Sequence, residues 1–199
     1  MDYFIAIPSL GEVSITWSIT FKELIIPGTY SIGCWIGLPV DVVRNRLVKD
    51  AQDAKAKFIF FLDSDVLPPA DSLAMMRQFH HPIVTGIYWA KPGYPAVWRY
   101  KRGKYLPITN WGNAGSFNVD AAGAGCLLID MRVFDVVPYP WFKWGVRDPR
   151  SKRKGLGEDF YFFRKAAKHG FPAICVPAVQ CKHQGRSEMM PDGTYCPSV

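Results

Sequence analysis

The first ninety residues alternate between short apolar runs and longer segments in which apolar positions recur at helical spacing. In residues 40–54, Val43, Leu47, Ala51 and Ala54 fall on one face with charges opposite, as in an amphipathic helix. The run KFIFFL at residues 57–62 is almost unbroken in its apolarity, which is expected of a central parallel strand buried on both faces. The pattern predicts strands at Tyr3–Ile7, Tyr30–Ile36, Lys57–Leu62 and Pro82–Tyr88, and helices at Val13–Ile25, Val40–Ala54 and Asp71–Phe79.

The second half of the chain is less regular. Residues 91–119 are rich in Gly, Pro, Asn and aromatic residues, which favours loops and short antiparallel strands. Beyond them we expect a core segment at Ala121–Ile129, helices at Asp130–Val136 and Gly157–His169, and a last core strand at Pro172–Val176. The alternation of strands and helices predicts an α/β fold, with a mostly parallel central sheet and a small antiparallel portion. We expect one domain over residues 1–184 and a loose C-terminal tail over residues 185–199.

Composition agrees with one folded domain. Hydrophobic residues make up 49% and aromatic residues 15% of the 199 positions, enough for a sizeable core, which excludes a disordered chain. The longest apolar runs fall far short of the roughly 18 residues of a membrane-spanning helix, and no secretory signal is recognisable. Five cysteines without a C-x-x-C pair argue against a disulfide framework or a structural zinc. We therefore expect a soluble, cytoplasmic protein.

The net charge of +7 is unevenly distributed. Residues 1–100 hold 9 Lys/Arg and 9 Asp/Glu, whereas residues 101–199 hold 15 and 8. Five of these cations crowd into residues 147–154, a patch that could attract phosphates, nucleic acid or an anionic surface, or could simply be a solvated loop. Glycines bound the surrounding segment, residues 145–157, so a further hypothesis is a lid that orders over a bound diphosphate.

An acidic pair directly follows the apolar strand. In Asp63-Ser64-Asp65, two carboxylates stand one residue apart, at the strand end that points into the ligand-binding crevice of open α/β sheets. Such a pair can hold a hard divalent cation and leave positions open for water and phosphate oxygens. The alternative is a turn in which one Asp caps the helix that begins near Ala70. Because the buried strand precedes the pair, we favour the metal site.

Two further features could carry chemistry. Glu158 and Asp159 open a helix after a Gly-rich segment. Acidic residues suit a helix N-terminus electrostatically, but Asp159 could also act as a general base. His183 lies just beyond the last core strand. It is either a surface or capping residue or, as a neutral imidazole, the completion of a carboxylate metal site.

Taken in order, these motifs resemble the GT-A class of nucleotide-sugar-dependent glycosyltransferases, over roughly residues 3–184. The chain is most similar to the family 2 branch. The resemblance rests on Ile5-Ala6-Ile7-Pro8-Ser9 at the first strand end, Val43-Arg44-Asn45 on a helix, Asp63-Ser64-Asp65, Ala122-Gly123-Ala124-Gly125, Glu158-Asp159 and His183. The long C-terminal extension that shapes the acceptor site in many family 2 enzymes has no counterpart in this sequence, so the acceptor stays open.

The resemblance implies a role for each motif. It implies transfer of a sugar from a nucleoside-diphosphate sugar to an acceptor hydroxyl, with inversion, assisted by Mn²⁺ or Mg²⁺. The implied metal ligands are Asp63, Asp65 and His183. The implied base is Asp159, with Glu158 as the fallback. The implied nucleotide-sugar contacts are Pro8, Ser9, Arg44, Asn45 and Ser64, with Arg44 on the diphosphate, and the implied acceptor side is Gly123, Ala124 and Gly125.

Other functional classes explain less of the pattern. A basic nucleic-acid-binding module would account for the charge of residues 147–154 but not for the acidic pairs or His183. A haloacid-dehalogenase-type phosphatase also carries D-x-D after a strand, but near the start of the chain and followed by Gly-Thr, whereas Val66 and Leu67 follow here. A Rossmann dehydrogenase is disfavoured because no G-x-G-x-x-G follows the first strand.

Overall fold

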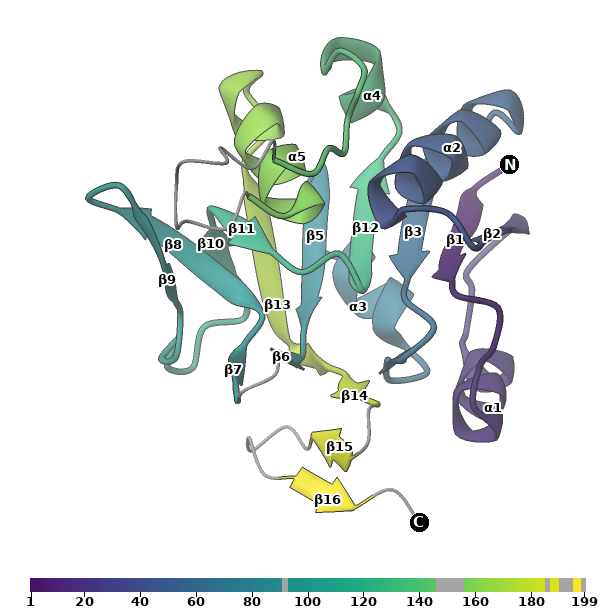
Figure 1. Cartoon of the computed structure of the whole chain (residues 1–199), viewed down its shortest axis with the longest axis horizontal. Helices are drawn as coiled ribbons and strands as arrows, with labels where there is room; N and C mark the ends of the chain where they lie inside the picture. Colours follow the sequence, from purple (N-terminus) through teal and green to yellow (C-terminus); the bar gives the residue numbers. More distant parts are fainter. Residues whose placement is uncertain (91–92, 146–155, 185–186, 190–194, 198–199) are drawn as a thin grey trace.

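A seven-stranded mixed sheet forms the centre of the molecule (Figure 1). The computed structural model describes residues 1–90, 93–145, 156–184, 187–189 and 195–197. In spatial order the strands are β10 (Phe117–Val119), β13 (Ala173–Gln180), β5 (Ile83–Ile87), β12 (Cys126–Asp130), β3 (Phe58–Leu62), β1 (Tyr3–Ser9) and β2 (Tyr30–Ile36). All but β10 and β12 share one direction, so the carboxyl ends of β1, β2 and β3 meet at one edge.

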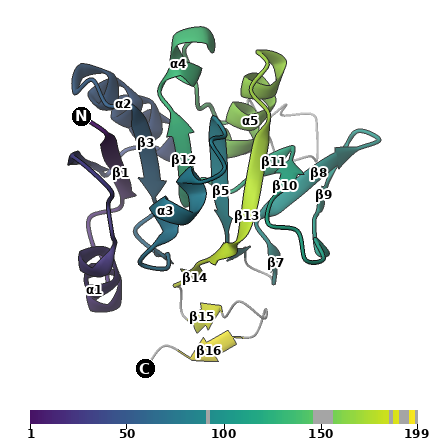
Figure 2. The ribbon, with the colours of Figure 1, turned by 180° about the vertical axis from the view of Figure 1, so that it is seen from behind.

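Helices cover both faces of this sheet (Figures 1 and 2). On one face lie α2 (Val40–Asp53), α4 (Arg132–Val136) and α5 (Glu158–Lys168); α1 (Ile15–Glu23) and α3 (Ser72–Arg77) belong to the other. Successive strand residues point to opposite faces: in β3, Ile59 and Phe61 join the first core cluster, whereas Phe60 and Leu62 join the second. The apolar run at residues 57–62 is therefore buried on both sides, as its pattern predicts.

Smaller antiparallel sheets flank the centre. One consists of β8 (Val97–Lys101), β9 (Lys104–Pro107) and β11 (Ala121–Ala122), and a hairpin joins β6 (Trp89–Ala90) to β7 (Tyr94–Pro95). Another contains β4 (Val66–Leu67), β14 (Lys182–His183), β15 (Ser187–Met189) and β16 (Tyr195–Pro197). The pairing of β4 with β14 is the important one for function, because it brings the end of the acidic turn beside His183.

The structure corrects three details of the sequence interpretation. The expected segment Ala121–Ile129 is two strands, β11 and β12, separated by residues 123–125, and β12 runs antiparallel to both of its neighbours. The last core strand continues to Gln180 rather than ending at Val176. The expected loose tail, residues 185–199, contains β15 and β16. The basic loop at residues 147–154 and most of the hypothetical lid lie outside the described residues. No helix in the described part of the chain has the length and apolarity needed to cross a membrane.

Candidate active site

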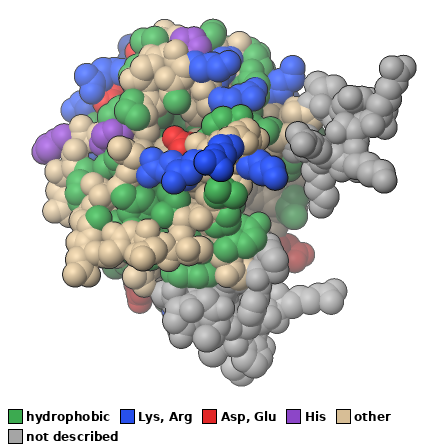
Figure 3. Space-filling model, turned by 90° about the vertical axis from the view of Figure 1, so that its left-hand side faces the viewer, with side chains coloured by type: hydrophobic (Ala, Val, Ile, Leu, Met, Phe, Trp, Pro, Cys, Tyr) green, Lys and Arg blue, Asp and Glu red, His purple; other side chains and the backbone are tan. Residues whose placement is uncertain are grey.

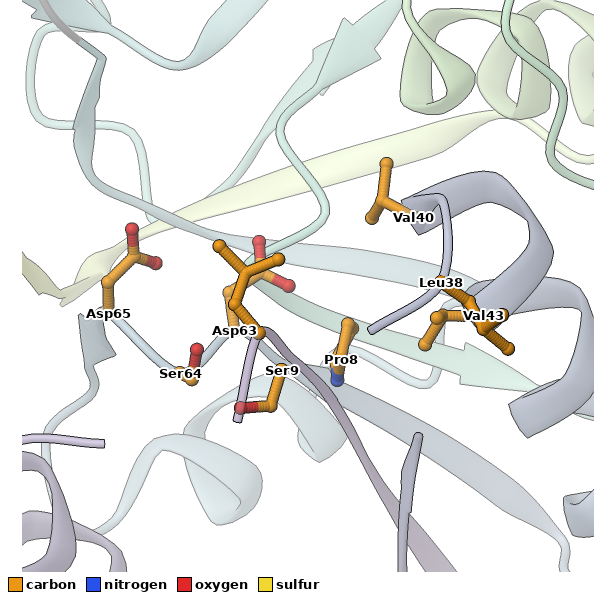
Figure 4. Close-up of a pocket in the computed structure, with 9 residues that line it drawn as sticks. Pro8, Ser9, Leu38, Val40, Val43, Asp63, Ser64 and Asp65 are labelled. Atoms are coloured by element: carbon orange, nitrogen blue, oxygen red, sulfur yellow. The ribbon is translucent and has the colours of Figure 1, made fainter. Parts of the chain in front are cut away.

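A pocket of about 270 Å³ opens where β1, β2 and β3 end (Figure 4). Pro8, Ser9, Asp63, Ser64 and Asp65 form its polar side. Leu10, Leu38, Val40 and Val43 add an apolar wall from the loop after β1 and the start of α2. Of the five predicted nucleotide-sugar contacts, three line this pocket: Pro8 and Ser9 from the end of β1, and Ser64 from the turn after β3. Its location is the ligand-binding crevice expected of an open α/β sheet.

The backbone of the acidic turn is fixed from three directions. The indole Nε1 of Trp17 on α1 donates to the Asp63 carbonyl at 3.0 Å, and the Asp63 N–H donates to the Gly125 carbonyl at 3.0 Å. The N–H of Gln184 donates to the Asp65 carbonyl at 2.6 Å. Sequence reasoning missed Trp17 and Gln184, because nothing in the local pattern indicates that they reach this turn. These bonds hold both carboxylates of the pair on rigid backbone.

Arg44 connects the two acidic pairs. Its guanidinium binds both Asp63 oxygens, at 2.9 and 3.1 Å, while its Nε lies 3.4 Å from Oε1 of Glu158. The side chain is only 3% exposed and lies over the ring of Phe61. Burial alone would lower the pKa of Arg44, but the carboxylates of Asp63 and Glu158 raise it, so the guanidinium stays charged. The predicted contact of Arg44 with a diphosphate stays a prediction; the contacts that the structure gives it are with these carboxylates.

Asp159 is a partly buried carboxyl at the start of α5. Its Oδ1 accepts a hydrogen bond from the N–H of Phe160 at 2.7 Å. Burial, together with the neighbouring charge of Glu158, raises the pKa of Asp159 to about 7. A Cβ on residue 157 would lie 2.7 Å from Oδ1 of Asp159. The absence of a side chain on Gly157 therefore leaves the space that this carboxyl occupies. A carboxyl that titrates near pH 7 is matched to proton transfer at neutral pH.

Asp65 and His183 face each other across the turn. The imidazole Nε2 lies 3.2 Å from Oδ2 of Asp65, and Nδ1 lies 2.9 Å from the carbonyl of Trp89. Because a carbonyl only accepts, Nδ1 carries the hydrogen, and in the neutral ring the lone pair is on Nε2, toward Asp65. Asp63, the third predicted ligand, is engaged by Arg44. Within the described residues no group of three or more His, Cys, Asp or Glu side chains is gathered as a metal site.

The segment Gly123-Ala124-Gly125 packs around a tyrosine that the sequence interpretation missed. The N–H of Gly125 donates to Oη of Tyr88 at 3.2 Å, and a Cβ on Gly123 would collide with that same oxygen. The Tyr88 ring also lies edge-on to His183, with centroids 5.2 Å apart. These glycines therefore allow close approach, but the group that they admit here is Tyr88. Their contact with an acceptor stays a prediction.

We predict that Gly123→Ala destabilises the fold by about 1–3 kcal/mol, as overpacking of a filled core does, and lowers donor binding. The physical reason is the collision of the new methyl group with Oη of Tyr88. Urea denaturation of the single variants and of Gly123→Ala with Tyr88→Phe measures the coupling. Because Tyr88→Phe removes the nearest obstructing atom and leaves only the ring Cζ, 2.8 Å from the new Cβ, the double variant should be more stable than the sum of the single effects predicts. Simple additivity would contradict this explanation of the glycine.

Asn45 does not line the pocket and is held by hydrogen bonds to other parts of the chain. Its amide donates to the carbonyls of Asp41 and Phe142, and its Oδ1 accepts from the N–H groups of Trp141 and Phe142. Those four bonds use the whole hydrogen-bonding capacity of the amide. In this state Asn45 therefore fixes the segment before α5, and no capacity is left for the nucleotide-sugar contact expected from the sequence.

A basic surface lies on the β8–β9 hairpin, whose Trp98 and Tyr105 rings pack against Phe160 at the start of α5. Figure 3 shows Lys and Arg side chains gathered over the face that carries the β8–β9 hairpin. Lys101, Arg102 and Lys104 are exposed there. The nearby carboxylate of Asp120 lies 3.9 Å from Arg99. Since residues 147–154 lie outside the described chain, the binding-module alternative gains no support from this hairpin alone.

Solved structures share this fold at low sequence identity. No protein-family model matches the sequence, and comparison with curated proteins gives no match either. The crystal structure of A197 from STIV matches with a TM-score of 0.71 at 20% identity, over 100% of this chain and 95% of that one. GalNAc-T7, crystallised with UDP, GalNAc and Mn²⁺, matches with a TM-score of 0.62 at 10% identity, over 92% of this chain and 44% of its own.

A third match is S. aureus TarS, residues 1–349, with a TM-score of 0.54 at 12% identity, over 91% of this chain and 59% of TarS. GalNAc-T7 and TarS are GT-A glycosyltransferases. This chain thus spans about half the length of these two. At such identities the likeness concerns the fold alone. It agrees with the α/β fold class expected from the sequence, and the assignment to family 2 stays a prediction.

Proposed function

We propose that this protein is a glycosyltransferase that moves a sugar from a nucleoside-diphosphate sugar to an acceptor hydroxyl, with inversion. The observation that carries the proposal is the network through Arg44, which joins the acidic turn at the pocket to the Glu158–Asp159 pair. A donor held at Asp63-Ser64-Asp65 would thereby lie beside a carboxyl whose pKa is about 7. The GT-A fold of GalNAc-T7 and TarS supports the same reading.

The apolar and polar walls of the pocket suit different parts of the donor. Leu38, Val40 and Val43 offer a flat apolar surface to the nucleoside base, as binding pockets commonly do. Ser9 and Ser64 offer hydroxyls to the ribose and diphosphate. Asn45 takes no part in this arrangement. Arg44 positions Asp63 and Glu158 through its contacts with both carboxylates, and its contact with the diphosphate is part of the proposal.

Asp159 supplies the base in the proposed reaction. Its carboxylate takes the proton of the acceptor hydroxyl as the hydroxyl oxygen bonds to the anomeric carbon. The bond between that carbon and the leaving diphosphate oxygen breaks, and its electron pair remains on the diphosphate. With Oδ1 bound to the Phe160 N–H, Oδ2 is the oxygen suited to receive the proton. Gly123, Ala124 and Gly125 form the acceptor side in this proposal.

The donor atoms around Asp65 fit a divalent metal. Asp65 and His183 present an oxygen and a nitrogen lone pair to each other at 3.2 Å, and the Trp89 carbonyl fixes the imidazole tautomer. Carboxylate oxygens suit Mg²⁺ and Mn²⁺ alike, so the proposed ion is one of these two. When bound, such an ion would neutralise charge that develops on the leaving diphosphate. Asp63 would join the set by sharing its carboxylate with Arg44.

We predict that Asp65→Ala abolishes Mn²⁺-dependent binding of the nucleotide donor and leaves the melting temperature of the free protein almost unchanged. The Asp65 side chain is half exposed, so its loss costs the core little. His183→Ala should weaken binding less, because water can replace one neutral ligand. Calorimetric titration of a nucleotide-sugar panel, with and without Mn²⁺, measures both effects. Exposed Asp71→Ala is the control, and undiminished donor affinity in Asp65→Ala would place the site elsewhere.

A further inference from the structure

α1 and β2 lie at one flank of the molecule (Figures 1 and 2). The segment that contains them carries most of the large hydrophobic side chains that are exposed in the described part of the chain. Among the described residues fifteen large hydrophobic side chains are exposed, and eight of them lie between positions 10 and 36. In the same segment the sequence has only three charged residues, Glu12, Lys22 and Glu23. The eight are Leu10, Val13, Ile15, Ile19, Ile25, Tyr30, Ile32 and Ile36. Single exposed apolar side chains are common on protein surfaces, but a concentration of this kind is typical of an interaction surface.

The strand β2 is an unprotected sheet edge within this flank. It pairs with β1 along its whole length, and no described strand lies on its other side. Tyr30, Ile32, Cys34 and Ile36 form an exposed row on one face. Natural edge strands usually carry a charge, a proline or a bulge that prevents pairing. The sequence YSIGCWI has neither a charge nor a proline, and its pairing with β1 is regular.

The free edge decides which kind of partner fits. A lipid surface could take up the apolar side chains, but it would leave the outward backbone N–H and C=O groups of β2 without partners, which hydrocarbon does not tolerate. The charged residues of the flank sum to a net −1, so they would not attract anionic headgroups either. A second β-strand satisfies the backbone groups of the edge. It also places a second apolar row beside the first on the same face, so that the two rows contact each other as cross-strand pairs.

We propose that β2 pairs with β2 of a second copy of this chain, antiparallel about a twofold axis. Such an interface uses one self-complementary patch, which is the commonest symmetry of soluble oligomers. If the seven of these side chains other than Leu10, which lines the pocket, each contribute on the order of 100 Å², the flank offers about 700 Å² per copy, close to one partner's share of a standard interface. The pairing does not depend on the glycosyltransferase assignment.

Sedimentation velocity over a concentration series tests the proposal. The wild-type chain should sediment as a dimer, and Ile32→Lys as a monomer with an unchanged far-UV circular dichroism spectrum. Val136→Lys is the control, because Val136 is 55% exposed but lies on α4, away from β2; this variant should remain dimeric. A wild-type chain that stays monomeric at the highest concentration would overturn the proposal, as would an Ile32→Lys chain that still dimerises. A monomer that cosediments with phosphatidylglycerol vesicles would assign the flank to lipid instead.

The thiol of Cys34 gives a second readout on the same strand, since it is exposed in the single chain. The rate at which Cys34 reacts with a thiol reagent is measured by subtracting the reaction of the Cys34→Ser variant from that of the wild-type chain. The proposal predicts that dimerisation protects Cys34 and that Ile32→Lys restores its reaction. A Cys34 that reacts equally fast in both backgrounds would contradict the strand pairing.

Discussion

Asp159→Asn should lose turnover by about 10²–10⁴, the contribution of a positioned general base, and should melt at a higher temperature than the wild-type chain at pH 8. The first effect follows from removing the proton acceptor. The increase in melting temperature follows from removing a charge that folding partly buries. Because folding raises the pKa of Asp159 from 3.8 to about 7, the folded protein holds this proton more tightly than the unfolded chain does.

The sign of the pH dependence follows from that difference. Stability contributed by Asp159 is present below about pH 4 and is lost as the pH rises toward 7, after which the cost of the buried charge stays constant. The stabilisation of Asp159→Asn should therefore grow between pH 4 and 7 and then level off. Thermal melts at several pH values measure it, and the turnover of the wild-type enzyme should rise with an apparent pKa near 7.

Two outcomes would contradict this role. If Asp159 serves only the helix dipole, worth about 0.3–1 kcal/mol, Asp159→Asn should melt at a lower temperature and keep nearly normal turnover. If turnover survives in Asp159→Asn but collapses in Glu158→Gln, the base is Glu158. Glu158→Gln also weakens the contact with Arg44, so its melting temperature should fall.

Arg44→Met should destabilise the fold by about 3–5 kcal/mol, the usual cost of removing one partner from a buried ion pair. The methionine fills much of the space over Phe61, so the loss reports mainly on the uncompensated carboxylates of Asp63 and Glu158. Urea denaturation measures the free energy of unfolding. Arg46→Met is the matched control, because Arg46 lies on the same helix but is exposed. It should cost no more than about 1 kcal/mol, the value of its cation–π contact with the Trp35 ring.

The pH dependence separates lost charge compensation from lost packing. Burial raises the pKa of Asp63 and the Arg44 charge opposes that rise. Without Arg44 the pKa of Asp63 should rise further, so the difference in stability from wild type should shrink as the pH falls from 8 to 5. A difference that is independent of pH would mean that Arg44 contributes packing alone. Retention of full donor affinity in Arg44→Met would contradict its role in positioning the turn.

The sequence predicted the framework of the site better than its interior. Hydrophobic periodicity located β1, α2, β3 and α5, because burial of one face is a local property of a strand or helix. The turn at Asp63–Asp65 and the start of α5 followed from those elements. The periodicity did not indicate the antiparallel direction of β12, since a buried strand has the same pattern in either direction.

Contacts between distant residues account for what the sequence could not show. Arg44 was expected on a diphosphate, whereas its guanidinium contacts carboxylates 19 and 114 positions away. Tyr88 carries no motif, and only its collision with a Cβ at Gly123 explains why glycine stands there. Asn45 was expected at the nucleotide because of its place in a motif, but its bonds to residues 141 and 142 depend on tertiary packing.

Release of nucleoside diphosphate from a panel of nucleotide sugars, with Mn²⁺ and with water or simple glycans as acceptor, tests the central claim most directly. The account predicts that at least one donor is cleaved, only when metal is present. Cleavage should disappear in Asp65→Ala and fall by about 10² or more in Asp159→Asn. Metal-independent cleavage, or no binding and no cleavage of any donor by a folded protein, would contradict it.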